Sequence, residues 1–439
     1  MRIELFRLKN GLRCLLFPKE DFESTTFSFY VKLGKDYENK KELGVSHFLE
    51  HMVFRGSKNF PSVERVREEL EKIAAIYNGE TYQTQTHYYI KTLSKFQERS
   101  IFLLSDLVKN PLFKDEDVEK EKSIILEEIK MSNDDRMKKN FHNLMRTLFE
   151  NKIWGEDVAG REETIKNINR KILLRYHKKF YNAQNSLFII VGKIENLKIT
   201  KKLIEENFKD LPQGKNFFLP FINISPPKKT HFEIDKEINQ VYFSMGTFMP
   251  VYGFKDLVKN KFFIDFFTVN RILGAGSKNR LFSKIRDELG LVYYIESYLF
   301  YNYNRLMFFI ASGIKKEKFL EGIQAIFEEI EKIKKDGFSK EEIEIAYNSE
   351  ISEMLMYFEN PVNLSRFYAD FYLYFIKEFK KIDLKDFLIK LIPSKPNFEE
   401  INKKAKFLLN KNFCFSLTVE NEKIKKDFYK LLKNFNYLR

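Results

Sequence analysis

Residues 44–56 read GVSHFLEHMVFRG. The pattern over Glu42–Phe54 is helical, so His47 and His51, four residues apart, lie on one face of the helix, one turn apart. Two imidazoles at this spacing can bind the same metal ion. Glu50 lies beside the pair, where its carboxylate can accept a proton from a metal-bound water. The order His-x-x-Glu-His inverts the more common His-Glu-x-x-His motif of metallopeptidases, and we therefore expect a metal site with Glu50 as general base.

The alternative is that His47 and His51 are ordinary helix residues. The chain has only six histidines. Two of them at this spacing, with a glutamate in the third position of the motif, seldom coincide by chance. The pattern therefore indicates a metal site.

A catalytic zinc ion usually takes three protein ligands and keeps one position open. No third histidine lies near the motif, so the sequence predicts a distant carboxylate. A helix predicted over Asp117–Met131 offers three candidates: Glu121, Glu127 and Glu128. Glu121 and Glu128 share an apolar face of this helix, where a carboxylate needs a partner, whereas Glu127 points elsewhere.

Around the motif, strands and helices alternate. Arg2–Leu8 and Leu12–Phe17 flank Asn10-Gly11, which predicts a β-hairpin with a two-residue turn. Thr25–Leu33 is predicted to be a strand, and a second helix is expected over Ser62–Tyr77. Thr86–Thr92 is predicted to be another strand, followed by long helices and a buried strand.

The second half repeats this order, with predicted elements at Gln240–Phe248, Phe262–Leu273, Arg280–Leu289, Val292–Tyr301 and Arg305–Ser312. Each half reads strand, helix, helix, strand, long helices and strand, which indicates an old duplication. Residues 210–229 contain four of the eleven prolines and show no clear period. We therefore expect a metal-bearing domain over residues 1–212, a linker over residues 213–229 and a related domain over residues 230–439.

The composition is that of a globular protein, with 439 residues and a formal net charge of +14. Lysines are spread along the chain among glutamates, which is typical of solvated helix faces, although a functional basic surface is the alternative. We expect no nucleic-acid partner. Cys14 and Cys414 lie in apolar runs and are expected to be buried thiols. No apolar run reaches membrane-spanning length and Met1–Lys19 lacks a signal-peptide pattern, so we expect no membrane association and a cytoplasmic location.

With these residues in place, the chain resembles the pitrilysin and mitochondrial processing peptidase family of zinc peptidases over nearly its whole length. Residues 44–56 match the signature helix of that family. The family's third ligand lies 76 or 77 residues beyond the second histidine, and here the interval from His51 to Glu128 is 128 − 51 = 77. The segment Glu121–Ile129, EKSIILEEI, also matches. The resemblance implies that Glu128 is the third ligand, that Glu121 supports the site, and that Glu127 takes no part.

The resemblance also implies a substrate-binding strand and a second group of functional residues. Asn78-Gly79-Glu80-Thr81 resembles the family strand that pairs with extended substrate, with Gly79 where alanine is usual. In the same region Thr84 replaces a common acidic residue, and His87 is expected to be structural.

In the second half, residues 279–293, NRLFSKIRDELGLVY, match the segment in which an arginine and a tyrosine seven residues apart reach the substrate. These are Arg286 and Tyr293, with Tyr294 as the alternative tyrosine. One of the two side chains, Arg286 or Tyr293, is expected to stabilise the oxyanion.

The expected fold class is α+β, with two homologous domains that each pack a mostly antiparallel sheet against long helices. The resemblance implies that the two domains together form half of a clamshell around a closed chamber. The expected function is a zinc-dependent endopeptidase with one Zn²⁺ per chain and Glu50 as general base, which hydrolyses peptides or unfolded segments in an enclosed chamber. The resemblance implies that two such chains pair, and because this chain carries both halves of the site, we expect a homodimer. The alternatives are a processing peptidase for one leader peptide and a non-catalytic structural subunit.

Overall fold

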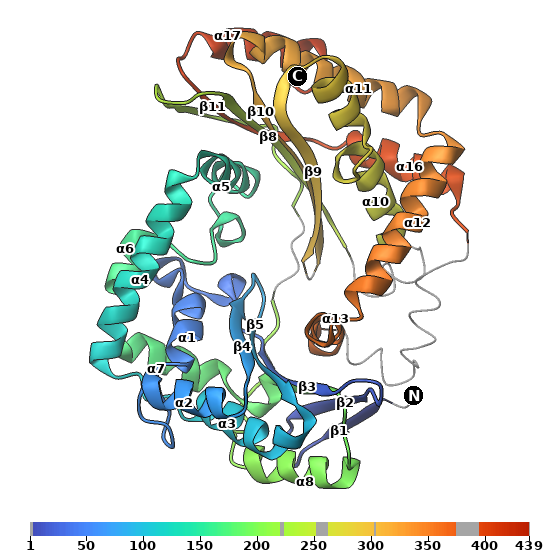
Figure 1. Cartoon of the computed structure of the whole chain (residues 1–439). Coiled ribbons are helices and arrows are strands. Elements are labelled where there is room, and N and C mark those ends of the chain that lie inside the picture. The colour runs from blue at the N-terminus through green and yellow to red at the C-terminus, as the bar shows by residue number, and fades with distance from the viewer. Residues whose placement is uncertain (1–2, 220–223, 252–261, 303, 375–394, 439) are drawn as a thin grey trace. The chain divides into compact units, whose positions relative to one another are not determined.

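The computed structural model describes residues 3–219, 224–251, 262–302, 304–374 and 395–438. The described residues fall into two units, each built on one β-sheet (Figure 1). Unit 1 contains the described residues of Met1–Met131, Glu156–Pro220 and Met356–Lys381. Unit 2 contains those of Ser132–Gly155, Phe221–Leu355 and Ile382–Arg439. Each unit therefore includes a segment from the other half of the sequence.

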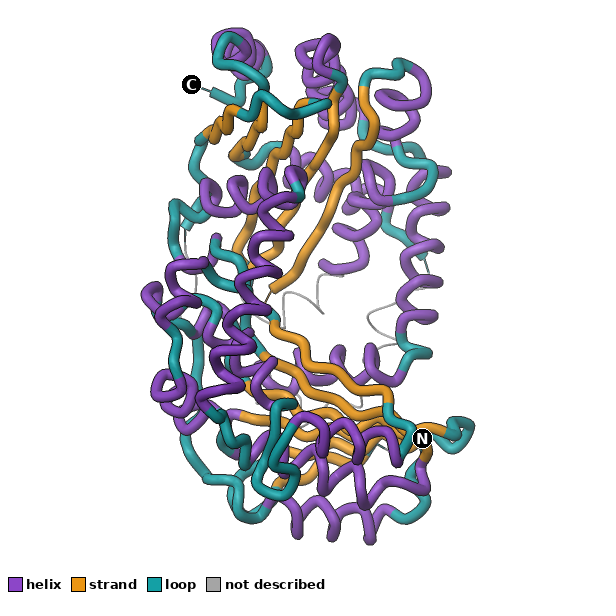
Figure 2. The backbone as a smooth tube through the Cα atoms, turned by 60° about the vertical axis from the view of Figure 1, so that its left-hand side comes forward, coloured by secondary structure: helices purple, strands orange, loops and turns teal. Residues whose placement is uncertain are grey.

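Unit 1 has a six-stranded sheet in the order β1-β2-β6-β3-β5-β4. Neighbouring strands are antiparallel except β2 and β6, which are parallel. In Figure 2 these strands form one layer with helices packed below it. The strands are β1 (Glu4–Arg7), β2 (Arg13–Pro18), β3 (Ser24–Val31), β4 (Ile76–Thr81), β5 (Thr86–Leu93) and β6 (Ser186–Gly192).

The α-helices that belong wholly or mostly to unit 1 are α1 (Val45–Val53), α2 (Val63–Lys72), α3 (Gln97–Lys109), α4 (Asp115–Asp134), α6 (Glu162–Asn167), α7 (Arg170–Phe180), α8 (Leu197–Phe208) and α13 (Pro361–Tyr374).

Unit 2 has a five-stranded sheet in the order β7-β11-β8-β10-β9, with one parallel pair among the described strands, β7 and β11. Its strands are β7 (Thr230–Ile234), β8 (Val241–Pro250), β9 (Val292–Asn302), β10 (Arg305–Ile314) and β11 (Cys414–Val419). Its α-helices are α5 (Arg136–Leu148), α10 (Phe262–Asn270), α11 (Phe319–Asp336), α12 (Lys340–Tyr357), α16 (Phe398–Leu409) and α17 (Ile424–Asn434), and two π-helical turns are η6 (Arg271–Ala275) and η7 (Phe282–Glu288).

The predicted fold class is confirmed, because each unit packs helices on a sheet that is antiparallel apart from one strand pair. The five-strand order β2-β6-β3-β5-β4 of unit 1 recurs as β7-β11-β8-β10-β9 in unit 2, with the parallel pair at the same place. This correspondence supports the duplication inferred from the sequence. Residues 220–223 of the predicted linker lie outside the described residues, and the linker and domain boundaries stay predictions.

Local predictions agree with the structure in most places, and a hairpin at Asn10-Gly11 is confirmed by the antiparallel pairing of β1 and β2. The predicted two-residue turn is wrong, because the Leu8 N–H donates to the Leu12 carbonyl at 2.9 Å and the turn therefore has three residues, 9–11, with Gly11 at a φ of +97°. The predicted C-terminal end of the second helix, Tyr77, is wrong. This helix stops at Lys72, and Ala74 takes a positive φ of 46° before β4 begins at Ile76. Ile76 and Tyr77 therefore form part of an edge strand, which suits their branched and aromatic side chains.

The two faces of the unit 1 sheet differ in polarity, as β3 shows. Its alternate residues Phe27, Phe29 and Val31 point into the apolar core that the sheet shares with α1 and α3. The intervening residues Thr26 and Ser28, together with Tyr30, point to the opposite face, because successive side chains of a strand alternate. One face is therefore apolar and the other mixed.

Helix α13, from the second half of the sequence, covers the mixed face and contacts β3 and β6 (Figure 1). Ser365 Oγ lies 3.0 Å from the Tyr30 hydroxyl. Arg13 Nη1 donates to the carbonyl of Tyr372 at 2.6 Å. In unit 2, α5, from the first half, contacts β8 and β11 in the corresponding way. The two halves thus exchange one helix each.

Lys32, directly after β3, is fully buried, and its ammonium nitrogen has no hydrogen-bond partner among the described residues. Burial, together with the positive charge of Arg13, lowers the pKa of Lys32 from 10.5 to about 7. The Phe218 ring, whose centroid lies 4.4 Å from Nζ, offers partial compensation as a cation–π contact. Lys32 is therefore a destabilising group in the folded chain when it is protonated.

Both cysteines, Cys14 and Cys414, are buried free thiols, as predicted. Among the residues that the structure describes, no helix combines the length and apolarity needed to cross a membrane.

Replacing Lys32 by methionine should stabilise the protein at pH 7. Between pH 7 and 10.5 the unfolded chain binds a proton at Lys32 that the folded chain does not hold, so this residue makes the wild type less stable as the pH falls from 10.5 to 7. We expect Lys32→Met to raise the free energy of unfolding at pH 7 by on the order of 2–4 kcal/mol, and by less at pH 10. Urea unfolding at the two pH values measures this, with Lys198→Met on the exposed face of α8 as control. An equal effect at both pH values, or destabilisation, would contradict the assignment.

Candidate metal centre

Helix α1 carries the motif, and its first turn is fixed by a carboxylate outside the helix. Gly44, at the N-cap, has a φ of +91°, a conformation that favours glycine. The buried side chain of Glu38 accepts hydrogen bonds from the backbone N–H groups of Gly44 at 2.7 Å and Ser46 at 2.8 Å. Glu38 thus satisfies N–H groups at the helix start that Gly44 cannot cap with a side chain. Buried α1 residues such as Phe48 and Met52 face the core, so the opposite face presents the histidines.

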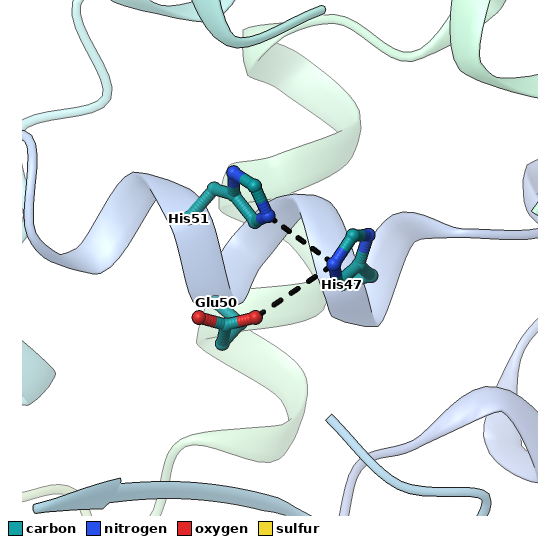
Figure 3. A group of neighbouring side chains, drawn as sticks. All are labelled: His47, Glu50 and His51. Atoms are coloured by element: carbon teal, nitrogen blue, oxygen red, sulfur yellow. Dashed lines mark hydrogen bonds and ion pairs between the residues drawn. The ribbon is translucent and has the colours of Figure 1, made fainter. Parts of the chain in front are cut away.

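The structure brings His47, Glu50 and His51 together (Figure 3). The two Nε2 atoms of His47 and His51 lie 3.2 Å apart. In a tetrahedral zinc site with Zn–N bonds of 2.0–2.1 Å, two ligand nitrogens lie about 3.3–3.4 Å apart. The pair therefore has the separation that one shared zinc ion requires. Without a cation or a proton between them, two imidazole lone pairs at this distance would repel each other.

A hydrogen bond at Nδ1 fixes the orientation of the His51 ring. Glu121 Oε2 lies 2.9 Å from His51 Nδ1, so Nδ1 carries the proton and Nε2 is free to act as a ligand. Glu121 is itself nearly fully buried and forms an ion pair with Arg55. Burial, followed by the nearby His51, lowers the pKa of His47 to about 4, so this ring is neutral at physiological pH.

Glu128, the predicted third ligand, lies on α4 close to both histidines. Its Oε2 lies 3.9 Å from His47 Nε2 and 3.8 Å from His51 Nε2, so it is almost equidistant from both. The side chain is 45% exposed, which leaves it free to move the remaining few tenths of an ångström towards an ion. The neighbouring Glu127 instead pairs with Lys130 at 2.6 Å on the solvated side of the helix. The donor set of two imidazoles and one carboxylate suits zinc.

Glu50 lies on the other side of the histidines, with Oε2 at 3.9 Å from His47 Nε2. Its carboxylate rests against β4, because a Cβ at Gly79 would lie only 2.2 Å from Glu50 Oε1. The glycine at position 79, where the resemblance leads one to expect alanine, is what permits this contact. Burial raises the pKa of Glu50 to about 7, although His51 acts in the opposite direction. A cation between the histidines would favour the ionised, proton-accepting form.

The predicted substrate residues Asn78, Gly79, Glu80 and Thr81 all belong to β4, the edge strand of the unit 1 sheet. They pair with β5 on one side, from Asn78 opposite Tyr89 to Thr81 opposite Thr86. No described strand pairs with the other side. An edge of this kind can accept an additional strand.

Glu80 is held on the face opposite Glu50 by Arg366 of α13, at 2.5 Å, and by His87 Nδ1, at 3.1 Å. Burial alone would raise the pKa of Glu80, but the hydrogen bond and charge of His87 and the charge of Arg366 bring it to about 2. His87 is fully buried and stacks on Tyr30 at 4.0 Å between ring centroids. Its contacts are those of the structural histidine that the sequence predicted.

Beside Glu50 lies a cavity of about 300 Å³ in unit 1. Its walls come from the end of α1, from α2, from β4 and from α4: Glu50, His51, Phe54, Arg55, Val63, Val66, Arg67, Tyr77, Asn78, Gly79, Glu121 and Ile124. A volume at the low end of the range for ligand sites fits one side chain rather than a whole ligand.

Arg286 and Tyr293 lie in unit 2, in η7 and at the start of β9. Tyr293 is 53% exposed, whereas burial raises the pKa of its neighbour Tyr294. Of the two tyrosines, the exposed Tyr293 is therefore the better candidate for contact with a substrate. The guanidinium of Arg286 lies 4.5 Å from the centroid of the Phe282 ring.

Sequence reasoning missed three residues that hold this site together: Glu38, Arg55 and Arg366. A local signal existed for Arg55, which follows His51 by four residues and so shares its helical side. Glu38 precedes α1 without a recognisable capping pattern. Arg366 is 286 residues away from Glu80, and no local pattern connects them.

Two family models match the chain. Residues 17–161 match the family described as Insulinase (Peptidase family M16), and residues 167–349 match the one described as Peptidase M16 inactive domain.

Similar proteins span most of the chain. An uncharacterized zinc protease of Rickettsia bellii is 31% identical over 295 residues, which are 66% of this chain and 68% of the relative. The uncharacterized zinc protease YmxG of Bacillus subtilis is 27% identical over 345 residues, which are 78% of this chain and 81% of the relative. The crystal structure of a protease from Helicobacter pylori has the same fold, with a TM-score of 0.83 and 18% identity, over 95% of this chain and 99% of that one.

Replacing Glu128 by glutamine should weaken zinc binding by about 100-fold or more, because the amide is neutral and a poorer ligand. Equilibrium dialysis against a zinc buffer, followed by metal analysis, measures the change. Glu127→Gln is the matched control, since Glu127 faces Lys130 and should leave the affinity unchanged. If Glu127→Gln loses zinc and Glu128→Gln retains it, the ligand lies one residue earlier than the geometry indicates.

Proposed function

We propose that this chain, which belongs to the insulinase family of peptidases (peptidase family M16), is a zinc-dependent endopeptidase that cleaves peptides or unfolded segments. The observation that carries the proposal is the pair of imidazole nitrogens 3.2 Å apart, with the Glu128 carboxylate nearly equidistant from both. His47, His51 and Glu128 would hold one zinc ion per chain. When bound, the ion would polarise the scissile carbonyl group and lower the pKa of the attacking water.

Glu50 is the residue that moves the proton in this proposal. It lies between the histidines and β4, beside the place where an extended peptide would add to the sheet. Its carboxylate takes a proton from the attacking water as the water oxygen bonds to the carbonyl carbon. The same group then gives that proton to the amine nitrogen as the carbon–nitrogen bond breaks. Glu50 therefore ends each cycle ionised, as it began, and the proton taken from water leaves on the amine product.

We propose that the substrate binds at the free edge of β4. A peptide that adds as a strand beside Asn78–Thr81 would be held by main-chain hydrogen bonds, which depend little on its sequence. The bond between Glu80 and Arg366 supports this edge from the α13 face. We therefore propose β4 as the substrate strand of the enzyme.

We also propose that two residues of unit 2 bind the substrate. The guanidinium of Arg286 and the exposed phenol of Tyr293 are donors suited to a carbonyl oxygen that gains negative charge during the reaction. We also retain as proposals the homodimer, because one chain carries both sets of residues, and the cytoplasmic location.

Purified protein should contain one zinc ion per chain and should cleave many unrelated peptides of a quenched fluorescent library. A chelator should abolish cleavage and added zinc should restore it, because the ion is needed to activate water. A chain that binds no zinc would contradict the peptidase proposal. Zinc binding without cleavage of any library peptide would favour a processing peptidase whose substrate the library lacks.

Glu50→Gln should retain zinc but lower kcat by at least about 100-fold, because an amide cannot accept the proton. Steady-state kinetics together with zinc analysis test this. Glu71→Gln, on the exposed side of α2, should behave like the wild type and serves as control. Full activity of Glu50→Gln would show that another group is the base.

A further inference from the structure

The cavity beside Glu50 has apolar walls. They are formed by the rings of Phe54 and Tyr77 and by the aliphatic side chains of Val63, Val66 and Ile124. Because Glu50 lies against β4 at Gly79, a peptide added along β4 would direct one side chain near the cleaved bond towards this cavity. These walls favour a side chain with an aliphatic stem.

Four charged side chains also line the cavity, and three of them have partners. Glu121 binds His51 Nδ1 at 2.9 Å and forms an ion pair with Arg55. Glu50 lies 3.9 Å from His47 Nε2 and belongs to the metal centre. Arg67 is exposed and makes no hydrogen bond or ion pair with any described residue; its charge acts on Glu64, one turn earlier, where it adds to the Ser62 hydrogen bond in lowering the pKa of that exposed carboxyl. Arg67 is therefore the charged group of the lining that remains available to a ligand.

The charge balance of the lining permits an anionic ligand. The positive charges of Arg55 and Arg67 offset the negative charges of Glu50 and Glu121, and a metal ion bound at the histidines would add further positive charge. A basic side chain in the cavity would face Arg67 without a free carboxylate to receive it. An acidic side chain would find a guanidinium with several free N–H donors, which suits a carboxylate in a bidentate arrangement.

We propose that Arg67 makes this cavity a subsite for an acidic side chain of the substrate, with the aliphatic stem of a glutamate against the apolar walls and its carboxylate on the Arg67 guanidinium. The inference rests on the proposed peptidase function and adds a substrate preference to it. Arg67 acts here as a specificity-determining residue and takes no part in the proton transfers. The same carboxylate chemistry could come from a peptide C-terminus, which the test must separate.

The test uses the zinc-loaded wild-type protein and a set of peptides blocked at both ends. Glutamate, glutamine, leucine or lysine is placed in turn at each of the two residues that flank the cleaved bond, and mass spectrometry identifies that bond. At the position that enters the cavity, the kcat/KM for glutamate should exceed that for glutamine by about tenfold. Peptides of the same sequence with a free C-terminal carboxylate close to the bond test the second source of the group.

Variants of Arg67 then assign the preference. Arg67→Gln should reduce the glutamate-to-glutamine ratio to about one, and Arg67→Glu should favour lysine over glutamate. The ratio is measured within one protein, so partial loss of folded material does not affect it. Arg65→Gln is the matched control, because Arg65 lies on the same helix, is paired with Glu68 and does not line the cavity. It should keep both the wild-type ratio and the wild-type rate.

A binding measurement separates substrate recognition from turnover. In the Glu50→Gln background, calorimetry should show tighter binding of the blocked glutamate peptide than of the glutamine peptide, and this difference should vanish in Glu50→Gln/Arg67→Gln. If wild-type protein cleaves peptides but Arg67→Gln keeps the wild-type ratio, the subsite assignment is wrong and the peptidase proposal stands. If only the free C-terminal carboxylate responds to Arg67, the acidic side chain is the wrong ligand. If the wild type cleaves nothing, the peptidase proposal fails first.

Discussion

The Nε2 atoms of His47 and His51 face each other at 3.2 Å, and this approach is favourable only when a positive charge lies between them. The surrounding residues are arranged to maintain it. Glu38 fixes the start of α1, Glu121 fixes the tautomer and orientation of His51, and Arg55 neutralises the buried Glu121. The cost of burying these charged groups is offset because each carboxylate has hydrogen-bond donors. Helix α1, the edge strand β4 and α4 all lie around this close pair of imidazole nitrogens.

The edge strand β4 connects this centre to the rest of unit 1. On one face, Gly79 lets the Glu50 carboxylate lie against the backbone. On the other, Glu80 is bound by Arg366 and His87, so the strand is held from both sides while its outer edge has no partner among the described strands. A strand that is rigid and unpaired is suited to bind an extended peptide, because little ordering remains to be done on binding.

The exchanged helix α13 accounts for the polarity of one sheet face in unit 1, whereas α5 in unit 2 packs Leu144 and Leu148 on an apolar face. In unit 1, the face under α13 carries Tyr30, Arg13 and the buried Lys32, and α13 supplies hydrogen-bonding partners to the first two. Such a face could not serve as an apolar core, whereas the opposite face, with Phe27 and Phe29, does so. The duplication thus leaves each sheet with one face packed by its own helices and one face covered by a helix of the other half.

Local sequence was sufficient to predict what depends on neighbouring residues. The spacing of His47, Glu50 and His51 fixed their arrangement on one helical turn, and Asn10-Gly11 fixed the first hairpin, because backbone geometry acts over a few residues. The end of α2 was missed, since the propensities of residues 73–77 are ambiguous and strand pairing with β5 decided the outcome.

The sequence by itself therefore determined the pattern of strands and helices and the placing of His47, Glu50 and His51 on one helical turn. The choice of Glu128 as the third ligand came from the resemblance and stays a prediction. Only the tertiary structure decided that α13 and α5 change places between the halves, that Arg366 holds Glu80 and that Arg67 lines a cavity beside Glu50. The physical reason is that these contacts join residues on separate elements. Their energies come from burial and charge pairing in the folded chain, and no short stretch of sequence contains both partners.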